Sequence, residues 1–260
     1  MEEDTPDTTE ANEVKRSKGI YLLPNLFTTA GLFAGFYAIV AAMGGRFEPA
    51  AVAVFIAMIM DGIDGRVARL TNTQSDFGKE YDSLADMVSF GLAPALVVYV
   101  WSLSTLGKIG WLAAFVYAAA AALRLARFNT RIGSVDKRYF QGLASPAAAG
   151  LVAGLVWMCD DYGLKGKDLA IVAFCATVAA GVLMVSNIYY LSFKELDLKN
   201  KVPFIAIVLV MVVFVVISLS PPQILFMVFL IYALSGPASA LYRLYKKNRA
   251  GKMLPPPDAP

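Results

Sequence analysis

The sequence predicts an all-α integral membrane protein with eight spanning helices. Of its 260 residues, 58% are hydrophobic and only 17% are charged. The mean hydropathy of +0.59 is likewise typical of membrane proteins rather than soluble ones. The apolar residues form long runs with short polar breaks between them, and each run is near the ~20 residues that cross about 30 Å of hydrocarbon.

The apolar runs follow one another along nearly the whole chain. The fifth run is the shortest, and the breaks include Gly44-Gly45 and Ser220-Pro221-Pro222. No A-x-A-like cleavage site follows the first run, so we expect it to be a retained helix and not a signal peptide. The eight runs cover residues 20–43, 47–68, 84–106, 109–128, 143–159, 169–191, 202–219 and 224–244.

Basic residues gather before the first run and after every second run. They are Lys15, Arg16 and Lys18; Arg66, Arg69 and Lys79; Arg131, Lys137 and Arg138; Lys194, Lys199 and Lys201; and Arg243, Lys246, Lys247, Arg249 and Lys252. The loops on the opposite side hold only Arg46, Lys108, Lys165 and Lys167. By the positive-inside rule, we expect a multi-pass protein of the cytoplasmic membrane with both termini in the cytoplasm.

Composition also excludes several kinds of chemistry. The chain has no histidine, which rules out a histidine general base, a phosphohistidine intermediate and the commonest zinc ligand. Cys159 and Cys175 lie in apolar runs and are typical of small core residues. The net charge of +3 is too small to indicate a nucleic-acid partner.

The stretch from Asp61 to Asp86 places polar side chains between two apolar runs. Asp61 and Asp64 are three residues apart and Asp82 and Asp86 are four apart, so each pair shares a helix face. Each carboxylate inside a bilayer costs roughly 2–3 kcal/mol, and clustered carboxylates repel one another. A hard divalent cation with oxygen ligands, Mg²⁺ or Mn²⁺, would satisfy them. Helix caps in a solvated loop are the simpler alternative, but they do not explain two helix-spaced pairs.

The residues around these carboxylates favour phosphate chemistry. Gly65 leaves the helix surface bare for close approach, and Arg69 offers a fork that suits a diphosphate. Ser75 adds a neutral hydroxyl, and Gly78 allows the loop to turn before the next helix. Carboxylates with a metal and an arginine indicate phosphoryl transfer, and the membrane setting indicates a reactant with acyl chains.

Eight positions within this stretch match the motif D-x-x-D-G-x-x-A-R-x8-G-x3-D-x3-D without a gap. They are Asp61, Asp64, Gly65, Ala68, Arg69, Gly78, Asp82 and Asp86. The chain therefore resembles the CDP-alcohol phosphatidyltransferases. The resemblance implies a six-helix membrane core, usually dimeric, with the motif on its second and third helices. The last two apolar runs would be additions to this core.

The resemblance also implies roles for individual residues. Asp61, Asp64 and Asp82 would ligate a pair of divalent metal ions, Mg²⁺ or Mn²⁺. Asp86 would also contact metal and act as the general base on the acceptor hydroxyl. The CDP-lipid would be bound by residues of the motif, of the following loop and of the start of the first helix, namely Asn25, Thr28, Gly65, Ala68, Arg69, Ser75 and Gly78.

Four further stretches are similar to the bacterial phosphatidylserine synthases of this family. They read PNLFTTAGLFAGFYAI, YDSLADMVSFGLAPA, ALRLARFN and FQGLASPAAAG, with Ala144 in place of a usual proline. This similarity implies CDP-diacylglycerol as donor, L-serine as acceptor and CMP as released product. The expected domains are a polar cytoplasmic tail (1–18), a six-helix catalytic domain (19–192), two additional transmembrane helices (193–246) and a disordered basic, proline-rich tail (247–260).

An acceptor with a carboxylate needs a cation near the carboxylate cluster. Arg124 and Arg127 share a face at the cytoplasmic end of the fourth run, and Asn129 and Ser145 lie nearby in sequence. These four residues are the candidates for acceptor binding. The alternative is that the arginines anchor the helix at the headgroups and that the polar side chains satisfy nearby backbone.

Two other functions remain open from the sequence alone. The same chemistry with a phosphorylated alcohol, such as glycerol 3-phosphate or inositol phosphate, would use several cations after the fourth run. A divalent-metal transporter would also place carboxylates in the membrane, but it predicts acids spread along a pathway through several helices. Here the acids cluster at one place, which favours the enzyme.

Overall fold

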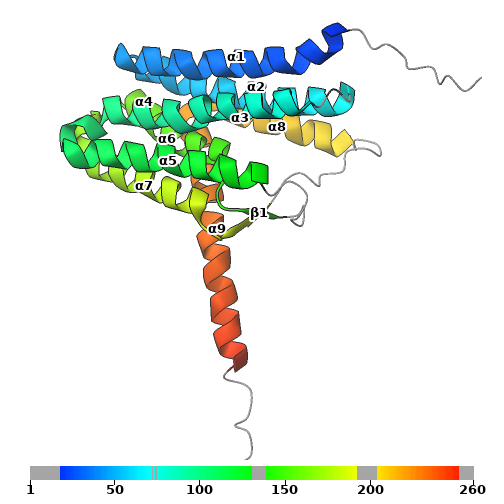
Figure 1. Cartoon of the computed structure of the whole chain (residues 1–260). Helices are drawn as coiled ribbons and strands as arrows, with labels where there is room; N and C mark the ends of the chain where they lie inside the picture. Colours follow the sequence, from blue (N-terminus) through cyan, green and yellow to red (C-terminus); the bar gives the residue numbers. More distant parts are fainter. Residues whose placement is uncertain (1–17, 72, 74, 131–138, 192–203, 252–260) are drawn as a thin grey trace, which may run out of the picture.

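The computed structural model describes residues 18–71, 73, 75–130, 139–191 and 204–251, and it shows a bundle of helices (Figure 1). Helices occur at every predicted apolar run. In chain order they are α1 (Lys18–Met43), α2 (Phe47–Thr71), α3 (Asp76–Asp86), the π-helix η1 (Met87–Leu92), α4 (Ala93–Trp101), the 3₁₀-helix η2 (Leu103–Leu106), α5 (Lys108–Thr130), α6 (Ser145–Asp161), the 3₁₀-helix η3 (Gly166–Leu169), α7 (Ala170–Val185), α8 (Phe204–Leu219) and α9 (Pro221–Gly251).

Within the described residues, five helical stretches are long and apolar enough to cross a membrane. They are Leu23–Met43, Asp76–Trp101, Lys108–Thr130, Gly166–Val185 and Pro221–Arg243. Helix α2 has 25 residues but carries several charges near its end, while α6 and α8 have 17 and 16 residues. The architecture is therefore that of an all-α multi-pass membrane protein.

The ends of three helices differ from the predicted boundaries. The third helix begins at Asp76, eight residues before the apolar run at 84, because the side chain of Ser75 caps its N-terminus. The helix at the sixth apolar run, α7, ends at Val185 instead of continuing to residue 191. Residues Tyr189–Leu191 form strand β2, which pairs antiparallel with β1 (Tyr139–Gln141). The helix at the fifth apolar run, α6, begins at Ser145, and its first turn contains Pro146, which is favoured at that place in a helix.

Part of the predicted organisation lies outside the described residues. This part includes most of the N-terminal tail, the proline-rich end and a set of the basic residues used to predict orientation. Those basic residues are Lys15, Arg16, Arg131, Lys137, Arg138, Lys194, Lys199, Lys201 and Lys252.

Small residues allow the helices to approach one another closely. Ala38 and Ala41 of α1 and Ala50 and Ala57 of α2 are fully buried in the core. A Cβ atom on Gly35 of α1 would lie only 2.7 Å from the Cα atom of Ser89 in η1. Because lipid tails are as apolar as side chains, such close van der Waals packing is the main force between helices in a membrane.

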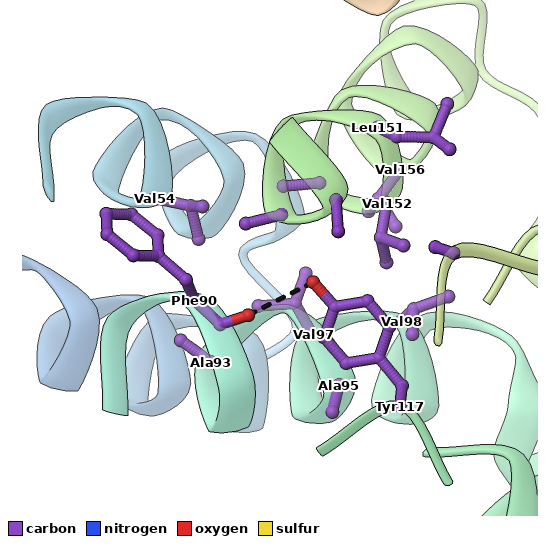
Figure 2. Packing of buried hydrophobic residues seen from close by; sticks show 14 of the residues in the cluster. Val54, Phe90, Ala93, Ala95, Val97, Val98, Tyr117, Leu151, Val152 and Val156 are labelled. Carbon is purple, nitrogen blue, oxygen red and sulfur yellow. Dashed lines mark hydrogen bonds between the residues drawn. The ribbon is translucent and has the colours of Figure 1, made fainter. Parts of the chain in front are cut away.

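The centre of the core lies around η1 and α4 (Figure 2). Phe90 of η1 packs there with Val54 of α2 and Val152 of α6, and each is at most 1% exposed. The hydroxyl of Tyr117, on α5, donates a hydrogen bond to the carbonyl oxygen of Phe90 at 3.0 Å. A π-helical turn displaces backbone groups from the regular α-helical pattern, and such turns are frequent at functional sites. Tyr117 thus satisfies a carbonyl in the turn that directly follows Asp86.

We predict that Tyr117→Phe lowers the free energy of unfolding by about 1–3 kcal/mol, because it leaves the buried Phe90 carbonyl without its hydroxyl donor. Thermal unfolding of the purified protein in detergent measures the change as a lower Tm. The matched control is Tyr162→Phe, since that side chain is 62% exposed. Equal Tm values for the two variants would contradict the prediction.

Candidate active site

Three of the predicted metal-binding carboxylates meet between α2 and α3, which both pack against α1. Asp61 and Asp64 come from α2 and Asp82 comes from α3, and one oxygen from each lies within 4.8 Å of the other two. Asp86, one turn further along α3, is not part of this close group but interacts electrostatically with all three. The structure therefore brings together three of the four carboxylates that the spacing placed on two helices.

Helix α1 is tied to this cluster by a buried hydrogen bond. The hydroxyl of Thr28 donates to Oδ2 of Asp64 at 2.7 Å, and both residues are 5% exposed. The same hydroxyl lies 3.2 Å from the carbonyl oxygen of Pro24, one turn earlier in α1. A bond to a charged oxygen is the stronger of the two, so Thr28 fixes Asp64 against the start of α1.

A cavity of about 180 Å³ opens beside the carboxylates, between α1, α2 and the loop before α3. All seven residues predicted to bind the CDP-lipid line it: Asn25, Thr28, Gly65, Ala68, Arg69, Ser75 and Gly78. Pro24, which opens the predicted lipid-binding stretch of the first helix, lines it too, whereas Thr73 and Lys79 are lining residues that the sequence did not indicate. The sequence places Lys79 among the basic residues of the cytoplasmic side, and its position between Gly78 and Asp82 of the motif is the signal that could have indicated its place at the cavity.

Gly65 and Gly78 of the motif must lack a side chain for different structural reasons. A Cβ atom on Gly65 would point into the cavity, where its nearest neighbour is Nη2 of Arg69 at 3.9 Å. The backbone there can thus approach a bound group. A Cβ atom on Gly78 would lie 3.1 Å from Oγ of Ser75, the oxygen that accepts the Gly78 amide at 3.0 Å. Gly78 therefore allows Ser75 to cap α3 tightly.

A second, much smaller cavity of about 10 Å³ lies deeper in the bundle. Asp61, Asp64, Asp82 and Asp86 all line it, together with Ser89 and Phe90 of η1. This volume is of the order that one water molecule or a small ion needs. Several carboxylate oxygens around one such space form the donor set that suits Mg²⁺ or Mn²⁺, so the residues present fit a divalent cation.

The four candidates for acceptor binding fall into two groups. Nη1 of Arg124 donates to Oγ of Ser145 at 3.1 Å, which brings these two residues together across α5 and α6. Arg127 instead donates to the backbone oxygens of Val185 and Ser186 at the end of α7. Asn129 donates to the hydroxyl of Ser83 on α3 at 2.9 Å. Arg127 and Asn129 thus connect helices, whereas Arg124 also interacts electrostatically with Asp86.

Comparison with known proteins identifies the class. The family model of the CDP-alcohol phosphatidyltransferases matches residues 21–189, and this chain belongs to that family. The match includes the whole carboxylate motif and ends before α8 and α9. Proteins of the family transfer a phosphatidyl group to an alcohol in a divalent-metal-dependent reaction.

Relatives in bacteria and archaea share most of the chain. A Helicobacter pylori protein named CDP-diacylglycerol–serine O-phosphatidyltransferase is 40% identical over 196 residues, which cover 75% of this chain and 83% of the relative. A Methanocaldococcus jannaschii protein of the same name is 38% identical over 183 residues, which cover 70% and 80% of the two chains. One from Mycobacterium leprae is 38% identical over 154 residues, which cover 57% and 51%.

We predict that Gly65→Val weakens binding of a cytidine nucleotide such as CMP by roughly tenfold or more, because the added side chain occupies the cavity. Equilibrium binding of radiolabelled CMP in detergent measures the effect. Gly62→Val is the matched control: it is on the same helix, does not line the cavity and has no heavy atom within 4 Å of its added Cβ. Equal losses in the two variants would instead indicate general damage to α2.

Proposed function

We propose that this protein transfers the phosphatidyl group of CDP-diacylglycerol to the hydroxyl of L-serine and releases CMP. The observation that carries this proposal is that all seven predicted lipid-binding residues line one cavity next to the carboxylate cluster. The names of the relatives support serine as the acceptor. The donor side of the site is thus built from α1, α2 and the start of α3.

Each part of the site has a role in this reaction. Arg69, Ser75 and the open backbone at Gly65 would bind the diphosphate and nucleotide of the donor. Asp61, Asp64 and Asp82, with Asp86 as a further ligand, would hold two Mg²⁺ or Mn²⁺ ions. Ions bound there would neutralise charge on the diphosphate and stabilise the leaving CMP.

The chemical step joins the serine oxygen to the phosphorus that carries the diacylglycerol. The bond between that phosphorus and the CMP oxygen breaks, and CMP leaves. In our proposal Asp86 takes the proton of the serine hydroxyl, because it interacts both with the other three carboxylates and with Arg124. Arg124, held by Ser145, would bind the serine carboxylate.

The membrane setting and the assembly are part of the same proposal. The distribution of basic residues supports a site on the cytoplasmic side of the cytoplasmic membrane, with both termini there. We assign catalysis to residues 19–192 and treat the helices of 193–246 as additions, with tails at 1–18 and 247–260. A homodimer follows from the resemblance to the family. The proposed reaction involves no nucleic acid. Membership of a family of transferases removes the alternative that the protein is a divalent-metal transporter.

The first test is an assay of CMP release by the purified protein. CDP-diacylglycerol is offered with Mg²⁺ or Mn²⁺ and with serine, glycerol 3-phosphate or inositol phosphate in separate reactions. We expect release with serine alone and its loss on addition of a chelator, because the carboxylate cluster needs a divalent cation. Release only with a phosphorylated alcohol would keep the donor site and overturn serine as the acceptor.

Asp86 and Asp61 are predicted to respond differently to removal of their charge. Asp86→Asn should lower kcat by about 100-fold or more while appreciable binding of CDP-diacylglycerol persists, because the base is lost but Asp61, Asp64 and Asp82 remain to hold metal. Asp61→Asn should weaken both turnover and metal-dependent binding, since it removes a ligand of the cluster. Single-turnover kinetics and lipid-binding measurements separate the two effects. Unaltered turnover in Asp86→Asn would remove this residue as the base.

A further inference from the structure

Helix α9 lies beyond the matched family region, yet it packs tightly against the core. A Cβ atom on Gly150 of α6 would lie 2.7 Å from the ring of Phe229, and one on Gly154 would lie 3.2 Å from the Cα atom of Phe226. These glycines let the two helices meet at distances that any larger residue would prevent. The docking of α9 on α6 is therefore built into the core helix itself.

The direction of α9 brings its middle to the end of the bundle that holds the active site. The helix begins beside the C-terminal end of α6, where Nε2 of Gln223 donates to Oδ2 of Asp161 at 2.6 Å. Further along, the backbone oxygen of Ala233 accepts the hydroxyl of Tyr190, a residue of strand β2, at 3.0 Å. The rest of α9 extends away from the other helices (Figure 1).

Tyr232 is fixed at this point by its neighbours. Its ring lies 5.5 Å from the ring of Tyr190, centroid to centroid, and the next residue accepts the Tyr190 hydroxyl. A Cβ atom on Gly236, one turn on, would collide with the same Tyr190 ring. Packing therefore leaves little freedom to the Tyr232 side chain, which interacts electrostatically with Arg124.

Arg124 is incompletely satisfied within the part of the chain that the structure describes. One of its nitrogens, Nη1, donates to Ser145, but the buried Nε has no hydrogen-bond partner there. A buried N–H without an acceptor costs roughly 1–3 kcal/mol, more in a charged group, unless something else accepts it. Helix α9 runs antiparallel along α6, with Phe226 at Gly154 and Phe229 at Gly150. One turn further, Tyr232 therefore comes to the start of α6, where Ser145 accepts a hydrogen bond from Arg124. Arg124 also interacts electrostatically with Asp86 and with Tyr232.

We propose that Tyr232 is a positioning residue for the acceptor, supplied by a helix outside the family core. It holds the Arg124 guanidinium beside Asp86, so that the Nε edge of the fork receives the carboxylate of an amino-acid acceptor. The hydroxyl of that acceptor then points toward Asp86. This inference rests on the proposed function, because it concerns the acceptor of the same reaction.

The test is the steady-state kinetics of Tyr232→Phe, which keeps the aromatic ring and its contact with Tyr190 but removes the hydroxyl. We expect the KM for serine to rise about tenfold, with kcat changed by less than twofold and the KM for CDP-diacylglycerol unchanged. A second variant, Arg124→Lys, should raise the same KM, and the double variant should be no worse than Arg124→Lys alone. Such non-additivity would show that the two side chains act as one unit.

Two other tyrosines provide matched controls. Tyr190→Phe removes the bond to Ala233 and tests whether looser docking of α9 alone changes the KM for serine. Tyr242→Phe changes an exposed residue of α9, 67% exposed, and should leave all constants unchanged. An equal rise in KM for Tyr190→Phe and Tyr232→Phe, or an unchanged KM in an active Tyr232→Phe, would overturn the proposal.

The kinetics also separate this inference from the proposed function. If the unmodified protein releases CMP only with another acceptor, serine is wrong and the Tyr232 proposal, which requires an acceptor carboxylate, is overturned with it. If the unmodified protein uses serine but Tyr232→Phe behaves like Tyr242→Phe, the proposed function stands and only the role of Tyr232 fails.

Discussion

Four carboxylates lie together among apolar helices, and their mutual repulsion and loss of hydration are the constraint on which the rest of the structure depends. Each charge in such a place is costly unless it is hydrogen-bonded or shares a cation. Thr28 of α1 donates a hydrogen bond to the Asp64 carboxylate. The small cavity among the four aspartates offers space for a cation, which would compensate the charges of the other three.

This arrangement works only if the helices that carry the carboxylates are held rigidly. Alanines of α1 and α2 and the close approach of Gly35 to Ser89 bring the backbones together without bulky side chains between them. The π-helical turn after Asp86 places the carbonyl of Phe90 in an apolar core, where the hydroxyl of Tyr117 donates a hydrogen bond to it. The core thus fixes the cluster through polar contacts as well as through packing.

Charge divides the site into two sides. Helices α1 to α3 contribute the carboxylates and the cavity with Arg69, which we assign to the diphosphate and its cations. Helices α5, α6 and α9 contribute Arg124, Ser145 and Tyr232 on the side of Asp86. A transfer reaction needs its two substrates held close together but by different groups, and this division provides that.

The helices, their order and most residues of the cavity beside the carboxylates could be predicted from the sequence. Span length, helical spacing and a contiguous motif are local properties, and the resemblance to the family added Asn25 and Thr28 of the first helix. The sequence did not indicate the β1–β2 pair, the capping of α7 by Arg127 or the electrostatic interaction of Tyr232 with Arg124. These features join residues from 48 to 108 positions apart, from the pairing of Gln141 with Tyr189 to the interaction of Arg124 with Tyr232. Only the packing of α9 and α7 against the earlier helices decides which of these side chains meet, since periodicity shows which face is apolar but not which neighbour covers it.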